Sequence, residues 1–132
     1  MKLAGCIITD LEHRVLLLHR NNGRHLQWEV PGGKVEAGED TETTAMRETN
    51  EELGVNVEII RKLGQCVFHQ DDDELDYTWY LARIVEGEPE IKEPQTFDSM
   101  SYMSLEDMRQ ETLSTGAWNF LGMLVDEETN LR

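Results

Sequence analysis

The segment from Asp40 to Gly54 constrains the fold more than any other part of the chain, because it carries both the start and the stop signal of one helix. Asp40 is a good N-cap, and Glu42 falls in the first turn, near the positive end of the helix dipole. Gly54 is placed as a C-cap. We therefore predict a helix over residues 40–53, ended by the glycine.

This helix has an acidic flank beside an apolar one. At about 100° per residue, Glu48, Glu51 and Glu52 project within one arc of about 100°. The apolar arc adjoins it and is formed by Ala45, Met46, Thr49 and Leu53. Like charges three or four residues apart destabilise a helix by roughly 0.2–0.5 kcal/mol per pair, so folding alone does not favour this acidic flank.

Two explanations of the acidic flank are open from spacing alone. Carboxylates projecting from a rigid helix are hard oxygen ligands, which suit Mg²⁺ or Mn²⁺ together with the phosphates of a substrate. The alternative is an ordinary solvated acidic face, since glutamate is a good helix former. Only the sequence around the helix can decide between them.

Short strands are expected on both sides of this helix. Apolar runs at 2–9 and 14–20 flank a turn and suggest a β-hairpin, and the glycine-rich stretch that starts at Pro31 reads as a structured loop. The remaining expected elements are strands at 28–30, in 55–70, in 75–86 and at 98–104, an acidic loop "DDDELD", a short helix 105–110 capped by Ser104, and a closing helix 116–127. Such a mixture predicts one α/β domain spanning 1–132, with helices covering a sheet.

Charge limits the partners. The chain of 132 residues has 12 Lys and Arg against 27 Asp and Glu, a formal net charge of −15. This charge repels nucleic-acid polymers and anionic membrane surfaces, although small anions can bind where cations accompany them. No apolar run approaches the roughly 20 residues that span a bilayer. Cys6 and Cys66 show no metal-ligand spacing, so we expect free thiols and a cytoplasmic protein.

The context of the acidic helix carries a specific resemblance. The stretch "GKVEAGEDTETTAMRETNEELGV" (33–55) matches the pattern G-x5-E-x7-R-E-U-x-E-E-x-G-U, where U is aliphatic. This pattern is the Nudix box, and the chain resembles the MutT type of Nudix hydrolase. The likeness extends from "VLLLHR" through "WEVPGGKVEAGE" to "ARIVEGEPEIKEPQ" and weakens over the final thirty residues. Thr49 is the one departure, at a position that calls for an aliphatic side chain.

The resemblance implies the Nudix fold, an α/β/α sandwich with a mixed β-sheet. It also implies hydrolysis of a nucleoside diphosphate linked to another moiety, most simply a (d)NTP or a modified dNTP giving NMP and pyrophosphate. An ADP-ribose or nucleotide-sugar pyrophosphatase is the alternative within the enzyme class. A nucleotide-binding Nudix sensor without turnover is the alternative of another class, although such proteins generally lose glutamates of the box.

The resemblance also assigns a metal site. It implies that Glu48, Glu51 and Glu52 bind Mg²⁺ or Mn²⁺ together with the carbonyl oxygen of Gly33. A loop glutamate completes the site, and Glu93 aligns best with it, while Glu86, Glu88 and Glu90 remain alternatives. Glu48, Glu51 and the loop residue Glu93 are the candidates for the catalytic base, and Glu48 is favoured among them.

The remaining implied roles concern positioning and substrate contact. Arg47 would orient the glutamates, and Lys34 would meet a phosphate oxygen. Arg20 ends a strand where MutT-like proteins place an arginine that contacts phosphate, although such an arginine can also be merely solvated. Gly54 has a structural role in the motif, and Glu39 is assigned a structural role there with a catalytic one as the alternative.

Base recognition needs an aromatic face and an amide. Asn119, between Trp118 and Phe120 in the closing helix, is the candidate for base contact. Helical spacing explains the two aromatic residues equally well as core residues. The sequence leaves the nucleotide and any homodimer undetermined.

Overall fold

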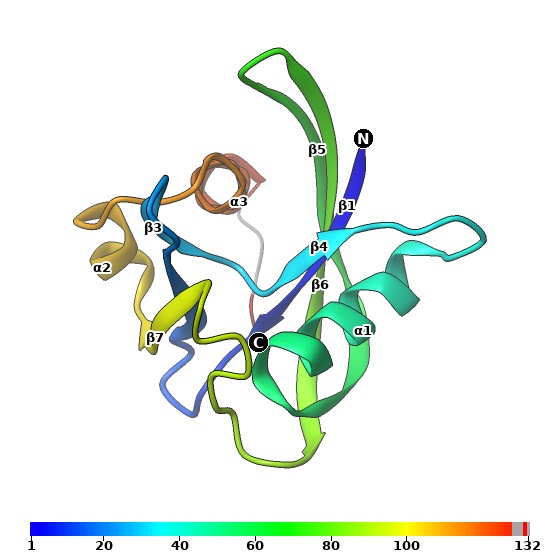
Figure 1. Cartoon of the computed structure of the whole chain (residues 1–132), viewed down its shortest axis with the longest axis vertical. Coiled ribbons are helices and arrows are strands. Elements are labelled where there is room, and N and C mark those ends of the chain that lie inside the picture. Colours follow the sequence, from blue (N-terminus) through cyan, green and yellow to red (C-terminus); the bar gives the residue numbers. More distant parts are fainter. Residues whose placement is uncertain (128–130, 132) are drawn as a thin grey trace.

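The strands form two sheets in the computed structural model, which describes residues 1–127 and 131 (Figure 1). The larger sheet has the order β4 (Gly32–Lys34), β1 (Lys2–Ile8), β6 (Asp73–Glu86), β5 (Asn56–Gln70). The smaller sheet has the order β3 (Leu26–Glu29), β2 (Val15–Asn21), β7 (Phe97–Met103). β1 runs parallel to β6 while the other pairs are antiparallel, so the larger sheet is mixed.

The helices begin and end close to where their capping residues predict. They are α1 (Thr41–Leu53), α2 (Leu105–Arg109) and α3 (Thr115–Glu127). The Asp40 carboxylate accepts the Thr43 N–H at 2.8 Å. Gly54 adopts a left-handed conformation with φ 72° and ends α1, as glycine does at little steric cost. Ser104 caps α2 through a reciprocal capping box.

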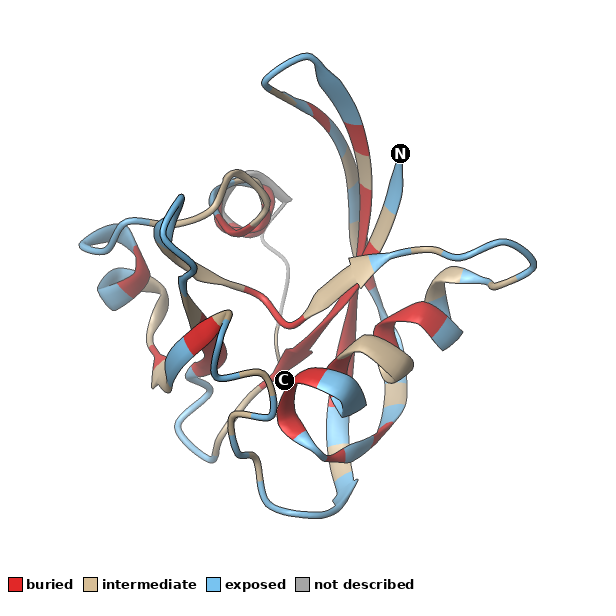
Figure 2. Cartoon of the chain, in the orientation of Figure 1, coloured by how far each residue is buried: buried red, intermediate tan, exposed pale blue. Residues whose placement is uncertain are grey.

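Helices cover both faces of the mixed sheet, which confirms the α/β class and the layered arrangement. Successive side chains of a strand point to opposite faces, and those of β1 pack on both sides of the sheet. Cys6 lies in a core cluster with Leu53 of α1. Ile7, the next residue, lies in a second cluster with Phe120 of α3. Figure 2 shows the buried positions where these elements meet.

Two expectations about the strands were wrong. β1 and β2 do not form a hairpin; they belong to different sheets and are joined by a single bridge between Thr9 and Val15. The glycine-rich loop contains a strand, β4, which pairs with β1. Both errors have one cause, because strand partners are chosen by burial across the whole fold and local sequence carries little of that choice.

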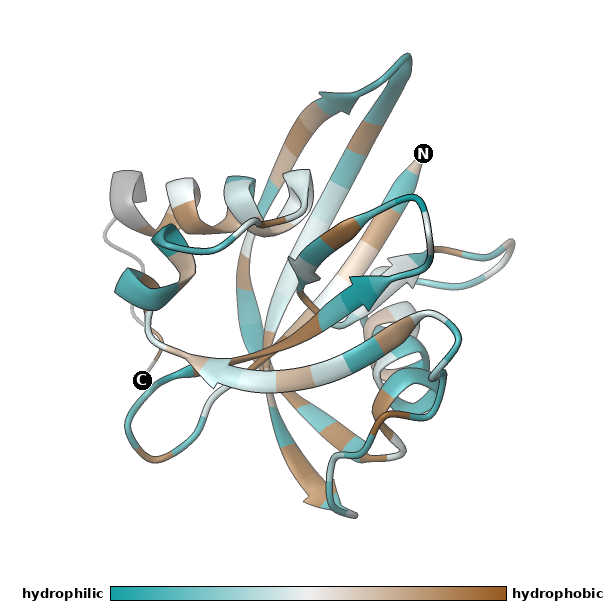
Figure 3. Cartoon of the chain, turned by 60° about the vertical axis from the view of Figure 1, so that its left-hand side comes forward, coloured by the Kyte–Doolittle hydropathy of each residue, from teal (hydrophilic) through white to brown (hydrophobic). Residues whose placement is uncertain are grey.

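The acidic segment expected as a loop is mostly strand. β5 and β6 continue to Gln70 and Asp73, which leaves Asp71 and Asp72 as the turn. Figure 3 shows apolar and polar bands alternating along this long hairpin, as expected for strands with one face covered. Cys6 and Cys66 are free, as predicted. No helix in the described ranges is long and apolar enough to cross a membrane.

Candidate active site

The acidic flank of α1 faces the short glycine strand β4. The N–H of Gly32 donates to Oε1 of Glu52 at 2.9 Å. A Cβ atom on Gly33 would lie 2.4 Å from the carboxyl carbon of Glu48, closer than real Cβ atoms come. Only glycine at position 33 therefore lets the backbone approach the Glu48 carboxylate this closely.

The three glutamates of the flank differ in burial. Glu52 is 5% exposed, and burial raises its pKa well above the ordinary value, with the negative charges of Glu48 and Glu93 adding to the rise. Burial also raises the pKa of Glu48, against the lowering effect of Arg47. The Glu51 side chain is 49% exposed. Burying like charges together costs free energy unless a cation compensates them.

Arg47 lies among these carboxylates and donates hydrogen bonds to several of them. Its Nε and Nη2 donate to the two carboxylate oxygens of Glu39 at 2.8 and 2.9 Å. Its Nη1 donates to Glu48 at 3.0 Å and to both oxygens of Glu51 at 3.3 Å. Nη2 also reaches the carbonyl oxygen of Lys34 at 3.2 Å, which ties β4 to α1.

Glu39 has the surroundings of a structural residue. Besides Arg47, its carboxylate accepts the Thr44 hydroxyl at 2.5 Å and the Glu36 N–H at 3.2 Å. The Arg47 guanidinium, followed by the Thr44 hydroxyl, lowers the pKa of Glu39 to about 2. Glu39 thus joins the loop to the start of α1 as a charged acceptor.

The loop after β6 brings Glu93 to the same cluster. The N–H groups of Glu90 and Lys92 donate to the carbonyl oxygens of Leu53 and Glu52, each at 3.0 Å, and this ties the loop to the last turn of α1. The negative charge of Glu93 raises the pKa of both Glu48 and Glu52.

The alternative loop glutamates have other surroundings. Glu86 accepts a hydrogen bond from Asn56 at 2.6 Å, and Glu90 pairs with Lys92. Glu88 is exposed. The electrostatic effect of Glu93 on Glu48 and Glu52 therefore favours Glu93 among the four candidates for the loop ligand.

The donor set suits a hard divalent cation. In the part of the chain that the structure describes, no three acidic, histidine or cysteine side chains are arranged closely enough to bind one metal ion, and Arg47 donates hydrogen bonds to Glu48 and Glu51. Nevertheless, Glu52 is buried among like charges, and Glu48 lies close to Gly33. A bound cation would compensate the negative charge of these carboxylates. Oxygen ligands of this kind fit Mg²⁺ or Mn²⁺.

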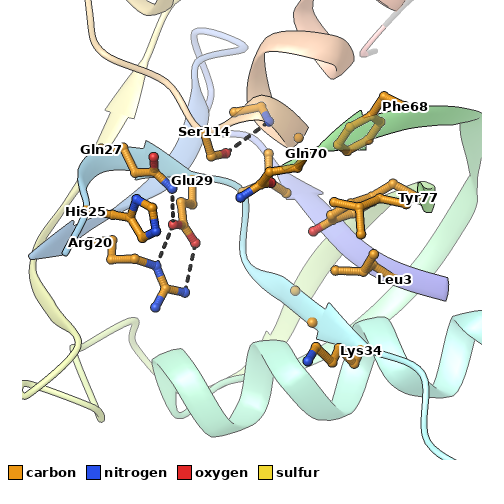
Figure 4. A pocket seen from close by; sticks show the side chains of 16 residues that line it. Leu3, Arg20, His25, Gln27, Glu29, Lys34, Phe68, Gln70, Tyr77 and Ser114 are labelled. Carbon is orange, nitrogen blue, oxygen red and sulfur yellow. Dashed lines mark hydrogen bonds and ion pairs between the residues drawn. The ribbon is translucent and has the colours of Figure 1, made fainter. Parts of the chain in front are cut away.

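A cavity of about 300 Å³ opens beside this cluster (Figure 4). One wall is formed by Gly32 and Gly33 and therefore adjoins the Glu48 and Glu52 carboxylates. The other lining residues come from several elements and are Leu3, Arg20, His25, Gln27, Glu29, Val30, Lys34, Phe68, Gln70, Leu75, Tyr77, Ser114, Gly116 and Ala117. Aromatic and apolar walls with a few polar groups are typical of a small-molecule site.

The two predicted phosphate-binding cations both line this cavity. Arg20 is not simply solvated, because its guanidinium forms two bonds with the Glu29 carboxylate, at 2.5 and 3.1 Å. Lys34 lies beside Gly33 at the other side of the cavity. Glu29 and Gln27 were not predicted as site residues, although their spacing of two just before Pro31 could have suggested two side chains on one face of a strand.

Asn119 lies apart from the cavity lining. Its amide donates to the Thr115 carbonyl at 2.8 Å, and its oxygen faces the Cys66 thiol at 3.8 Å. Base contact by Asn119 stays a prediction. Phe120 is a core residue, whereas Trp118 is 57% exposed. Phe68 and Tyr77 belong to a core cluster and line the cavity as well.

Comparisons with known proteins show the family of the chain. A family model described as "NUDIX domain" matches residues 2–123. The chain is similar to an 8-oxo-dGTP diphosphatase of Escherichia coli strain K12, with 29% identity over 107 residues, which cover 80% of this chain and 83% of the relative.

Two further similarities extend the comparison. An oxidized purine nucleoside triphosphate hydrolase of Danio rerio is 34% identical over 103 residues, covering 74% of this chain and 66% of the relative. The crystal structure of a MutT NUDIX hydrolase from Burkholderia pseudomallei superimposes with a TM-score of 0.81 and 29% identity, covering 93% of this chain and 96% of that one.

Proposed function

The chain belongs to the Nudix family and is a pyrophosphohydrolase, and on this premise we propose that it hydrolyses a nucleoside triphosphate to NMP and pyrophosphate with Mg²⁺ or Mn²⁺. The substrate is a (d)NTP or a dNTP with a modified base. The observation that carries this proposal is the cavity of about 300 Å³ that adjoins the glutamates of α1 through Gly32 and Gly33.

The size and lining of the cavity support one nucleoside as its occupant. A volume of about 300 Å³ is at the lower end of the range for small-molecule sites. Phe68 and Tyr77 offer aromatic faces for a base, while Gln27 and Gln70 offer amides for its polar edge. The names of the two curated relatives, which specify oxidised purine nucleotides, support the same substrate class.

The phosphates of this substrate would extend from the cavity toward α1. Arg20 and Lys34 line that route and supply positive charge in a chain with a net charge of −15. Arginine suits phosphate because its planar fork can donate two parallel hydrogen bonds. Small anions bind here despite the overall charge because the two cations lie beside the cavity.

Glu48, Glu51, Glu52, Glu93 and the Gly33 carbonyl would hold the divalent cation. When bound, that cation offsets the negative charge that develops on the phosphate oxygens and favours deprotonation of water. Arg47 keeps Glu48 and Glu51 in place through its three hydrogen bonds to them. Lys34 and Arg20 orient the substrate for in-line attack.

Glu48 is the proposed general base. Its side chain is 20% exposed, and burial raises its pKa, so it is a stronger base than a fully exposed glutamate. The proton of the attacking water passes to a Glu48 oxygen while the anhydride bond between the α and β phosphates breaks. NMP and pyrophosphate are then the two products, and no covalent intermediate is needed.

A substrate panel tests the proposal. The purified protein is incubated with dGTP, 8-oxo-dGTP, dCTP, ADP-ribose, nucleotide sugars and dinucleoside polyphosphates, with Mg²⁺ or with EDTA, and the products are quantified. We expect pyrophosphate from a triphosphate in Mg²⁺ and none in EDTA. Turnover of ADP-ribose or nucleotide sugars alone would replace the proposed substrate class, and binding without any product would point to a sensor.

A further inference from the structure

Three side chains on two adjacent strands form one hydrogen-bonded unit. Arg20 of β2 lies directly opposite Gln27 of β3, and Glu29 follows two residues later on the same face of β3. Nε of Arg20 donates to Oε2 of Glu29 at 2.5 Å, and Nη2 donates to Oε1 at 3.1 Å. The Gln27 amide donates to the same Oε2 at 2.8 Å, so Gln27 steadies the carboxylate that holds the arginine (Figure 4).

This unit differs from a surface ion pair. The side chains of Arg20 and Glu29 are 27% and 16% exposed. The guanidinium carbon of Arg20 also lies 5.0 Å from the centre of the Phe97 ring, and this contact further restricts the movement of the Arg20 side chain. By contrast, the Arg83–Glu58 pair on β6 and β5 is 63% and 51% exposed. A paired arginine that is mostly withdrawn from water keeps one orientation at less entropic cost than an exposed one.

The orientation of Arg20 leaves part of its donor capacity available. A guanidinium has five N–H groups, and two of them donate to Glu29. Within the described residues, the other three have no protein acceptor among the hydrogen bonds that the structure forms. The negative charges of Glu52 and Glu93 contribute to raising the pKa of Arg20, which also lines the cavity. Arg20 is therefore close to both the carboxylate cluster and the cavity.

We propose that Glu29 and Gln27 are positioning residues, which hold the Arg20 guanidinium so that its remaining N–H groups meet a phosphate of the substrate. This inference rests on the proposed function, because it takes a nucleotide to lie between the cavity and the glutamates of α1. Glu29 contributes through Arg20 and does not contact the reacting atoms. Its negative charge would by itself repel phosphate, so the two effects of Glu29 have opposite signs.

A double-mutant cycle separates positioning from repulsion and from a structural role. The value of kcat/KM is measured on the best substrate of the panel for wild type, E29Q, R20A and the double variant. Glutamine keeps one acceptor oxygen, so the fork loses one of its two bonds. We expect E29Q to lower kcat/KM about tenfold, equivalent to about 1.4 kcal/mol, in the presence of Arg20. In the R20A background we expect less than a twofold effect.

Two other variants test whether the effect is specific to this unit. Q27A leaves the Arg20–Glu29 pair in place, and we expect a smaller loss of two- to fivefold that also disappears with R20A. E58Q removes the same charge from the exposed Arg83–Glu58 pair, and we expect it to leave kcat/KM unchanged. Thermal unfolding of each variant shows whether the fold is intact.

Three results would overturn the inference. One is an equal loss for E29Q with and without Arg20, which indicates a role in the fold alone. The second is an unchanged or higher kcat/KM for E29Q, which indicates that repulsion dominates. The third is equal losses for E29Q and E58Q. If wild type releases no product from any nucleotide, the proposed function fails, and the same cycle measured as the Kd for inorganic pyrophosphate with Mg²⁺ still tests the positioning.

Discussion

Replacing Thr49 with valine should stabilise the protein, although Thr49 lies within the most specific motif of the chain. Thr49 is fully buried on the apolar flank of α1, and its hydroxyl has no hydrogen-bond partner among the described residues. The Cys6 thiol lies beside it but donates to the Ala45 carbonyl at 3.4 Å. A buried hydroxyl without a partner costs about 1–3 kcal/mol, so we expect T49V to raise the free energy of unfolding by about 1–2 kcal/mol.

Thr44 provides a matched control in the same helix. It is equally buried, but its hydroxyl donates to Glu39 at 2.5 Å and approaches the Asp40 carbonyl at 3.0 Å. T44V leaves a charged carboxylate without one of its donors, so we expect the free energy of unfolding to fall by about 1.5–3 kcal/mol. The same chemical change should thus have opposite signs five residues apart.

Urea unfolding of the metal-free protein, followed by tryptophan fluorescence, measures both effects. For a chain of this length a change of 1 kcal/mol corresponds to roughly 3–5 °C in Tm. We expect kcat/KM of T49V to stay within twofold of wild type, because Thr49 faces the core and the site lies on the acidic flank. A loss of stability in T49V would refute the reasoning, since it would mean that the Thr49 hydroxyl is bonded, most simply to Cys6.

Three further outcomes follow from the site. E52Q should lower kcat/KM by several orders of magnitude and yet stabilise the metal-free protein. The folded-state pKa of Glu52 is raised, so its ionisation lowers the free energy of unfolding as the pH rises above about 4.5. In a pH series of urea unfolding, E52Q should be more stable than wild type in EDTA and should not be stabilised by Mg²⁺. G33A should displace the Glu48 carboxylate and abolish most activity, whereas G122A, whose Cβ meets nothing within 4 Å, should be active in the same assay. The pKa of Glu39 is lowered to about 2, so its contribution to the free energy of unfolding is complete above about pH 4.5 and is lost as the pH falls toward 2. The free energy of unfolding of E39Q should therefore fall less steeply with pH over this interval than that of wild type, and parallel curves would contradict the pairing with Arg47.

The part of the fold that could be predicted is the part that local sequence controls. The caps at Asp40 and Gly54 and the capping box at Ser104 lie where the sequence predicts them, because each satisfies backbone groups within a few residues. The partners of strands follow a different rule. The expected hairpin of β1 and β2 is absent because burial on two faces sends these strands to different sheets.

The candidate site also has features that the sequence could predict and features that depend on the tertiary structure. The resemblance implied that Arg47 would contact the glutamates, and spacing supports this for Glu51 because residues four apart on a helix are neighbours. It could not show that Glu52 is almost fully buried while Glu51 is half exposed, because that difference depends on where β4 crosses the helix. The choice of Glu93 over the other loop glutamates also depends on a loop docking on α1.

By itself, the sequence determined one capped helix with an acidic flank, the glycine that approaches it and the family to which the chain belongs. Only the tertiary structure decided which residues form the cavity, because β2 and β3 are far from β5 and α3 along the chain. It brought Glu29 and Gln27 to Arg20 and left Asn119 beside Cys66. Helix geometry repeats every few residues and can be read locally, whereas contacts between distant strands depend on how all the apolar surfaces are buried together.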